Sequence, residues 1–405
     1  MRFALALFLV ATAAAQSGPR VELSHTQESL RGVSAVSRKI AWASGTNGTF
    51  LRTVDGGITW TPAQVPDAKA LDFRAVVAFS AAEAFLMSAG PGDLSRIYHT
   101  SDGGQHWQLQ FTNNNPKGFF DSMAFWDAKH GTVLGDPIPD ESGKLKFEVL
   151  ITDDGQTWQP IPPSQLPEAA QGEGAFAASN SCIAILASVN PERAATAASG
   201  TAEERRFSAA SSAEEKGASA PDPNIWFATG GKVARVFHSP DRGQTWQVFD
   251  TPILHGPDSA GIFSIAFRDV QHGVIAGGDY KHPRDDGPNL AFTNDGGQTW
   301  TLSDIHPQAY FSAVAYDHQV NLAALRQEAE QKSAEGAGKK IRVKPAAYQR
   351  LFIVGQDFIF DFRPPSNPRR IGGGKKLGPP FNAVSPYPEG GALVVGAKGS
   401  MAFIP

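Results

Sequence analysis

Several carboxylates and cations of this sequence stand where they can do chemistry. Two carboxylates held at a fixed separation can catalyse glycoside hydrolysis, and their separation decides the outcome. The best candidates for such a role are Asp121, Asp136 and Glu173. The same carboxylates beside cations can instead bind a polar ligand, such as a glycan or a peptide, without any reaction. The residues that we expect at such a ligand site are Arg31, Asn47, Arg74, Arg96, Ser259, Asp279, Tyr280, Lys281, Asp357 and Lys398.

Metal and cofactor chemistry has little support. Cys182 is the only cysteine and lies in an apolar run, which excludes an internal disulfide and a cysteine-based metal site and indicates a buried thiol. His130 and His272 stand in matched Phe-x-Asp-x-x-His-Gly contexts, which we interpret as local turns rather than a metal or acid–base pair. No glycine-rich dinucleotide loop is present. We predict no cofactor and no metal; a Ca²⁺ site using Asp136 and Asp279 is the remaining metal hypothesis.

An eight-residue pattern that ends in tryptophan recurs along the chain. Its tryptophans stand at positions 60, 107, 158, 246 and 300, so the steps are 47, 51, 88 and 54 residues. A near-constant step with one long exception indicates a repeat array that carries an insertion. The five copies are Thr53–Trp60, Thr100–Trp107, Ile151–Trp158, Ser239–Trp246 and Thr293–Trp300.

The physics of this unit is local. Aspartate and the hydroxyl residue can bond nearby backbone amides and hold a tight turn between two strands, while glycine supplies backbone angles that a side chain would forbid. The tryptophan then leaves the turn and is expected to fill the gap between neighbouring sheets. Two copies depart from the pattern, because His106 replaces threonine and Ile151 replaces the hydroxyl residue. We interpret these aspartates as structural rather than catalytic.

These units are similar to the Asp box, or BNR repeat, of sialidases and related propellers. Further stretches resemble a narrower group, the photosystem II stability/assembly factor-like propellers. The resemblance runs from about Gly32 to Trp300 and implies a β-propeller. Members of that group escort photosynthetic membrane proteins, so the resemblance also implies a binding or assembly role. The stretches concerned are Phe120–Asp127, Gly135–Pro137, Gly172–Phe176 and Gly277–Tyr280.

The sialidase reaction itself is not expected. Sialidases place their first arginine in an Arg-Ile-Pro motif ahead of the first Asp box. The nearest string here, Arg96-Ile97-Tyr98, lacks the proline and falls in the wrong repeat. Tyr280 and Glu173 can be imagined as the tyrosine nucleophile and its glutamate, but their spacing does not require it.

The predicted fold is all-β: a seven-bladed β-propeller of four-stranded antiparallel blades, with six or eight blades as alternatives. The last blade offers only three strands, and residues Arg20–Thr26 alternate as a strand that can complete it and close the ring. Two insertions, 190–223 and 318–347, are expected in blades 4 and 6; the first is predicted to be disordered and the second is charged. The predicted blades are Val33–Val65, Phe73–Phe111, Phe119–Ile161, Gly174–Ile253, Ile262–Ile305, Phe311–Arg363 and Phe381–Ile404.

This topology separates two ends of the ring. With strands lettered A to D from the axis outward, the D–A crossovers and B–C turns meet at one end, which we call the crossover end. The A–B turns, both insertions and the Asp boxes at the C–D turns lie at the other, the Asp-box end. Ligands usually occupy the crossover end of a propeller, because every blade contributes a loop there. All the candidate residues above are expected at the crossover end.

The N-terminus and the composition suggest where the protein works. Residues 1–15 combine Arg2, an apolar run and three alanines, which is typical of a secretory signal peptide, so residues 16–405 are predicted to form one periplasmic or secreted domain. A net charge of −4 gives no support for a nucleic-acid partner, and no stretch is predicted to insert into a membrane. We expect a monomer that binds an envelope protein or a glycan through its central funnel. The alternative is a glycan-active hydrolase or lyase, and the sequence leaves open whether the protein is an enzyme.

Overall fold

The computed structural model describes most of the chain. Three predicted segments, the signal peptide 1–15 and nearly all of 190–223 and 318–347, fall outside the described residues, and so does Asp357. Among the residues that are described, no helix is long and apolar enough to cross a membrane. The described ranges are 18–186, 223–304, 309–317, 350–355, 358–362, 369–372 and 380–405.

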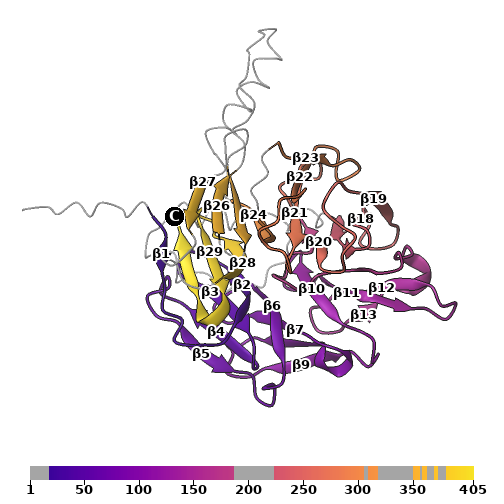
Figure 1. Ribbon diagram of the computed structural model, residues 1–405. Coiled ribbons are helices and arrows are strands. Elements are labelled where there is room, and N and C mark those ends of the chain that lie inside the picture. Colours follow the sequence, from indigo (N-terminus) through magenta and orange to yellow (C-terminus); the bar gives the residue numbers. More distant parts are fainter. Residues whose placement is uncertain are drawn as a thin grey trace, which may run out of the picture.

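Seven antiparallel sheets surround one axis, which confirms the predicted seven-bladed propeller (Figure 1). From the axis outward, blade 1 is β2 (Leu30–Ala35), β3 (Ala41–Gly45), β4 (Thr49–Thr53) and β5 (Thr61–Gln64); blade 2 is β6 (Asp72–Ala78), β7 (Ala84–Ala89), β8 (Arg96–Thr100) and β9 (Gln108–Thr112); blade 3 is β10 (Phe120–Phe125), β11 (Gly131–Pro139), β12 (Leu145–Thr152) and β13 (Gln159–Pro160); blade 4 is β15 (Ile183–Ile185), β16 (Ile225–Ala228), β18 (Arg235–Ser239) and β19 (Gln247–Asp250). Blade 5 is β20 (Ala260–Phe267), β21 (Gly273–Asp279), β22 (Leu290–Thr293) and β23 (Thr301–Leu302); blade 6 is β24 (Phe311–Tyr316), β25 (Leu351–Gly355), β26 (Phe358–Phe362) and β27 (Arg369–Gly372); blade 7 is β28 (Phe381–Pro386), β29 (Ala392–Gly396), β30 (Met401–Ile404) and β1 (Arg20–Val21). Two more strands, β14 (Glu173–Gly174) and β17 (Gly230–Gly231), pair with each other and join the sheet of blade 5, and η1 (Gly92–Leu94), η2 (Pro163–Gln165) and η5 (Ala397–Gly399) are short 3-10 helices.

The N-terminal strand closes the ring as predicted, although it is shorter than expected. β1 pairs antiparallel with β30 over two residues only, Arg20 and Val21. The next residue, Glu22, is buried; its carboxylate receives a hydrogen bond from Nε1 of Trp60 at 2.8 Å and an ion pair from Arg20 at 2.8 Å. Because Trp60 ends the Asp box of blade 1, this carboxylate joins the last blade to the first.

The Asp boxes hold their turns through the predicted local hydrogen bonds. In blade 1, the Thr53 hydroxyl donates to Asp55 and accepts from the Gly57 amide at 3.0 Å. The Asp55 carboxylate also accepts from the Thr59 amide at 3.0 Å and from the Thr59 hydroxyl. In blade 2, His106 takes the place of this threonine, with its Nδ1 2.6 Å from Asp102. The substitution therefore keeps the contact.

The Asp box of blade 3 corrects one expectation from the sequence. Ile151 does not replace the hydroxyl residue, because Thr152 fills that position: its hydroxyl donates to Asp154 at 3.1 Å and accepts from the Gly155 amide at 3.0 Å. The Asp154 carboxylate accepts from the amide of Thr157, three residues later, whereas the other boxes have a spacing of four. This copy is one residue shorter than the eight-residue unit, so it begins at Thr152 rather than at Ile151.

The box tryptophans fill the gaps between blades, as expected. The Trp107 ring lies 6.2 Å from Trp42 and 5.1 Å from Phe50, both in the preceding blade. Trp158 donates from Nε1 to Gln110 of the preceding blade at 3.1 Å. Each Asp box thus contributes to an inter-blade core as well as to its own turn.

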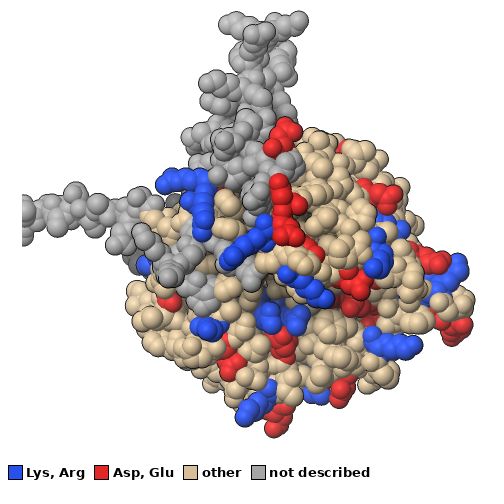
Figure 2. Space-filling view, viewed as in Figure 1, with Lys and Arg blue, Asp and Glu red and all other residues tan. Residues whose placement is uncertain are grey.

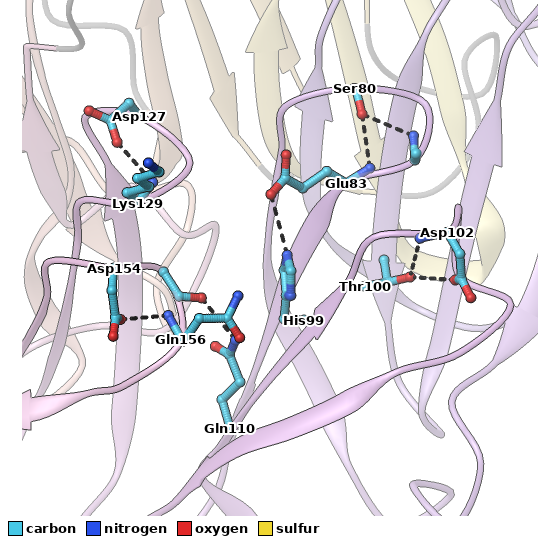
Figure 3. Close-up of polar contacts among 12 residues, drawn as sticks. Ser80, Glu83, His99, Thr100, Asp102, Gln110, Asp127, Lys129, Asp154 and Gln156 are labelled. Atoms are coloured by element: carbon cyan, nitrogen blue, oxygen red, sulfur yellow. Dashed lines mark hydrogen bonds and ion pairs between the residues drawn. The ribbon is translucent and has the colours of Figure 1, made fainter. Parts of the chain in front are cut away.

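The two ends of the ring are those that the topology predicted. In blades 1, 2 and 5 an Asp-box glycine bonds the A–B turn of its own blade, as when the Gly103 amide donates to the Ala82 carbonyl at 2.8 Å. Figure 3 shows Asp-box turns and A–B turns at the same end of the blades. His130 lies in such a turn, where its amide and ring contact Asp127 at 3.0 and 2.8 Å, and His272 repeats this geometry with Asp269. Both histidines are therefore turn residues, as predicted.

Candidate binding site at the crossover end

A β-bulge recurs near the start of six inner strands, at the crossover end. In β2, for example, Leu30 lies opposite Gly45 and Gly32 opposite Ser44, so Arg31 has no opposite residue. A bulge of this kind re-aims a side chain and is common beside functional sites. The six residues released from the ladder in this way are Arg31, Arg74, Asp121, Phe263, Ser312 and Asn382.

A glycine opposite the bulge makes this geometry feasible. In five of these blades the residue before the bulge lies opposite a glycine, and a Cβ there would collide with the carbonyl oxygen two residues before the bulge. Gly135, for instance, would meet the carbonyl of Phe119. The repeat therefore has a second signature besides the Asp box. The five glycines are Gly45, Gly135, Gly277, Gly355 and Gly396.

Blades 1 and 2 bring two arginines around one carboxylate. Arg74 Nε donates to Asp72 at 2.9 Å, and Arg31 Nε lies 3.8 Å from the other oxygen of Asp72. That gap is too long for a hydrogen bond, so Arg31 Nε has no partner among the described residues. Burial lowers the pKa of Arg31, and nearby Arg74 lowers it further, while Asp72 and Tyr310 oppose this. The Arg31 side chain as a whole remains 30% exposed, although its Nε atom is buried.

Blade 3 contributes three carboxylates. Asp121 is only 1% exposed, and burial, reinforced by the charge of Asp136, raises its pKa well above the ordinary value. Burial also raises the pKa of Asp136 to about 6, against one stabilising hydrogen bond from the Ala175 amide at 3.0 Å. Glu148, which accepts from Asn113 at 2.9 Å, has its pKa raised by burial too. The structure therefore brings two of the three predicted catalytic candidates together.

Blade 5 contributes aromatic rings. Phe263, the bulge residue of β20, stacks on Phe176 at a centroid distance of 3.9 Å and meets Tyr310 edge-on at 4.7 Å. Tyr280, in the following B–C turn, lies 6.1 Å from Phe263 and is 47% exposed. Burial raises the pKa of Tyr310, and the Arg31 charge lowers it, which places the tyrosine near the arginine pair.

The segment 175–181 lies across the axis. It contacts the inner strands of four blades: the Arg74 guanidinium donates to the Ala177 carbonyl at 3.0 Å, and Phe176 stacks on Phe263. On the other side, the Asn180 side chain accepts from the Met123 amide at 2.7 Å, and the Ser179 hydroxyl donates to the Ser312 carbonyl at 2.7 Å. These contacts with blades 2, 5, 3 and 6 make it a floor beneath the crossover end.

Glu173 stands apart from the other predicted catalytic carboxylates. It lies in β14, not in the inner strand of blade 4, and its buried carboxylate accepts from the Thr229 hydroxyl at 2.6 Å and from Nε of Arg235 at 3.0 Å. The Ala170 amide donates to its other oxygen at 2.7 Å. Both oxygens of the Glu173 carboxylate are thus engaged in holding the loop before the crossing segment.

The remaining predicted ligand residues are spread along the rim. Asn47 and Lys398 are exposed turn residues with positive φ, and the Asn47 amide group donates to Glu28 at 2.8 Å. Arg96 bonds the Asp93 carbonyl within η1. The structure does not bring these three into the group around the axis.

Asp279 and its neighbours also form a local turn. The Asp279 carboxylate accepts from the Lys281 amide at 2.9 Å and lies 2.9 Å from Nδ1 of His282, and the Tyr280 amide donates to the Ser259 carbonyl. Within the described part of the chain, no group of three carboxylate, histidine or cysteine side chains is arranged to hold a metal ion. The predicted Ca²⁺ pairing of Asp279 with Asp136 therefore gains no support. Cys182 is buried as expected, which raises the pKa of its thiol.

Sequence reasoning missed five residues of the central group. Two are charged and three are aromatic, and all lie within a few positions of a bulge or in the crossing segment. A pattern in the sequence could have identified Phe263. In it, a large apolar residue, which pairs with a distant glycine, directly precedes the released residue. The missed residues are Asp72, Glu148, Phe176, Phe263 and Tyr310.

Charges of both signs are interspersed over the visible face, without one large patch of either sign (Figure 2). The distinctive feature of the crossover end is the grouping of residues around the axis. Two arginines with Asp72, three carboxylates of blade 3 and an aromatic cluster at blade 5 lie around the axis beside the crossing segment.

Comparisons with known proteins agree with the repeats and the fold. A family model described as "Photosynthesis system II assembly factor YCF48" matches residues 11–118. A curated relative, the photosystem II assembly protein Ycf48 of Synechococcus sp. (strain JA-2-3B'a(2-13)), is 24% identical over 277 residues, which is 58% of this chain and 78% of that protein.

Solved structures show the same architecture. One described as YCF48 bound to D1 peptide has a TM-score of 0.59 and 14% identity, and covers 97% of this chain and 96% of its own. A structure of U3-55K has a TM-score of 0.56 and 11% identity, and covers 96% and 98%. The chain is therefore a seven-bladed Asp-box propeller that is similar to the photosystem II assembly factor Ycf48.

Proposed function

We propose that this protein is a non-catalytic binding or assembly module, which holds an extended segment of a partner protein across the crossover end. The observation that carries the proposal is the set of bulges, which gathers Arg31, Arg74 and the aromatic cluster above the crossing segment. Polar side chains with unused donors beside exposed aromatic surface suit a peptide, whose backbone and side chains offer both acceptors and apolar groups.

The comparisons support a protein partner. A Ycf48 structure of the same fold is described as bound to a peptide, and the curated relative is an assembly protein. A glycan remains the second ligand class, because the same arginines and aromatics can bind sugars. We further propose that the protein is exported, acts as a monomer in the periplasm or outside the cell, and meets its partner in the envelope; the signal-like residues 1–15 support this.

A glycan-active hydrolase or lyase is the alternative function. One observation favours it: Asp136, whose pKa burial raises to about 6, lies beside Asp121, and such a pair can supply a general acid. Two observations oppose it, because Asp121 is fully buried and Glu173 is neutralised by Arg235. Hydrolysis of plant or bacterial polysaccharides that disappears in Asp136→Asn would establish this alternative.

Affinity capture from envelope extracts tests the binding proposal. The bait is the full chain, compared with a double variant, Arg31→Gln with Arg74→Gln. The matched control is Lys39→Gln, which removes a cation from an A–B turn at the Asp-box end. A partner retained by wild type and by the control, but lost by the double variant, supports the proposal. Equal capture by all three, or no stable protein or glycan partner, contradicts it.

A further inference from the structure

Three carboxylates of blade 3 gather around one glycine. Phe120 lies opposite Gly135, and Asp121 and Asp136 are the residues that follow these two. Register shifts leave both aspartates without an opposite residue, and Glu148 on β12 lies opposite Gly135 itself. Two bulges in neighbouring strands therefore release two carboxylates at the same level of the sheet, beside a third.

None of the three carboxylates forms an ion pair with a described lysine, arginine or histidine. Glu173 shows the contrast, because the Arg235 guanidinium contacts both of its oxygens. Asp121 Oδ2 is buried and has no hydrogen-bond partner in the described ranges. A buried carboxylate oxygen in this state is unfavourable unless a donor or a cation reaches it.

Arg74 is the cation whose charge acts on Asp121, but it forms no ion pair with it. The charge of Arg74 lowers the pKa of Asp121, against the effect of burial, but the Arg74 guanidinium donates its hydrogen bonds to Asp72 at 2.9 Å and to the Ala177 carbonyl at 3.0 Å. No described cation therefore pairs with the carboxylate cluster, although the Arg74 charge acts on Asp121. Solvent reaches the cluster at Asp136 and Glu148, which are both half-buried.

We propose that the cluster of Asp121, Asp136 and Glu148 is a subsite for a primary ammonium group, supplied by a lysine of the bound partner. An ammonium is a compact charge with three donors, which matches three carboxylates better than a planar guanidinium does. A metal ion is disfavoured, because the described carboxylates do not have the arrangement to hold one. The inference rests on the proposed function, and it specifies the ligand: a segment that carries an acidic group over Arg31 and a lysine over Asp136.

Nuclear magnetic resonance of the full chain tests the subsite with a defined probe. The Ala175 amide reports on it, because it donates to Asp136 at 3.0 Å. The probe is Nα-acetyl-lysine methylamide, and the neutral control ligand is Nα-acetyl-norleucine methylamide. We expect a saturable shift of the Ala175 amide with the lysine compound and none with the norleucine compound. An equal response to both compounds, or no response to either, overturns the proposal.

Two variants locate the effect. Asp136→Asn should weaken binding of the lysine probe by about tenfold or more, because it removes the accessible charge. Asp93→Asn removes an exposed carboxylate from η1 at the same end and should change binding less than about twofold. Unchanged binding in Asp136→Asn, with the fold intact, contradicts the subsite.

The pH dependence gives a further readout. Binding should strengthen as the pH rises from 5 to 7.5, because the carboxylates must ionise to hold the ammonium. The groups that face Asp136 and Asp121 from neighbouring elements are Glu148, Arg74 and the Cys182 thiol. Only the carboxylates are expected to change charge in this range, so binding that weakens on raising the pH would contradict the assignment.

The outcomes separate this inference from the proposed function. A partner that is captured through Arg31 and Arg74 but binds Asp136→Asn normally, with no response to the lysine probe, removes the subsite and leaves the binding role. A clear response to the lysine probe without any captured partner keeps the subsite and removes the protein-binding role.

Discussion

The two ends of this propeller use polar residues in opposite ways. At the Asp-box end, the same hydrogen bonds recur in blade after blade, and Asp55 and Asp102 have a pKa lowered to about 2 by donors within their own turns. At the crossover end, the recurring feature is a backbone bulge, and the released residue varies in type: it is arginine in blades 1 and 2 and a different residue in each of the other four blades. There, Asp121 and Asp136 have a raised pKa because burial is not offset by donors.

The difference separates a folding device from a binding surface. A carboxylate with every acceptor site engaged stabilises its turn and has little left for a ligand. A buried carboxylate or guanidinium whose atoms lack hydrogen-bond partners lowers the free energy of unfolding, and a bound partner can supply the missing hydrogen bonds. The repeat therefore specifies the scaffold at the Asp-box end. At the crossover end, the bulge fixes the position of one residue in each of six blades but leaves its type free to vary.

The largest expected effect comes from an inter-blade tryptophan. Trp158→Ala should lower the free energy of unfolding by about 3–5 kcal/mol, because the side chain is only 6% exposed and packs between blades 2 and 3. Urea unfolding followed by circular dichroism measures the loss. The matched control is Tyr280→Ala at the crossover end, which should cost less than about 1 kcal/mol because the ring is 47% exposed. Equal losses for both would remove the contrast between the ends.

A second effect should have the opposite sign. Asp136→Asn is expected to stabilise the protein by about 2 kcal/mol at pH 7.5, because burial raises the pKa of Asp136 to about 6, above the ordinary 3.8. The stability that protonation contributes is fully present below about pH 4 and is lost as the pH rises through 6. The gain should therefore vanish near pH 4. Thermal unfolding of wild type and variant across this range measures it, and a gain that is independent of pH would refute the assignment.

The smallest effect should appear at the Asp-box end, with the reverse pH dependence. Hydrogen bonds from Thr59 lower the pKa of Asp55 to about 2, so its stabilising contribution is present above pH 4 and is lost as the pH falls through 2. Asp55→Asn should lower the melting temperature slightly at pH 7, and the difference should narrow towards pH 2. Melting curves at both pH values check this; a difference that grows in acid would count against the turn geometry.

The sequence predicted features that depend on local patterns. The Asp boxes gave the blade period, and the alternating residues near Arg20 gave the closing strand, since both follow from short-range hydrogen bonding and strand pairing. The candidates Arg31, Arg74, Asp121 and Asp136 followed from the topology, because crossovers and B–C turns share one end.

The missing parts depend on long-range packing. Nothing local in residues 175–181 shows that they cross the axis, because their partners Arg74 and Ser312 lie more than 100 residues away. Glu173 was predicted as a crossover residue open to a ligand, but its pairing with Arg235, 62 residues away, depends on how blade 4 closes. The predicted start of the third Asp box was wrong for a simpler reason. Its turn is one residue shorter, and Thr152 supplies the hydroxyl that bonds the Gly155 amide.

Hydrogen exchange on the captured complex tests the central claim most directly. If the crossover end is the binding surface, the partner should slow exchange in the crossing segment 175–181 and in the turn that carries Tyr280, while the Asp-box turns exchange as in the free protein. Protection that falls instead on the Asp-box turns, with the crossing segment unchanged, would contradict the account.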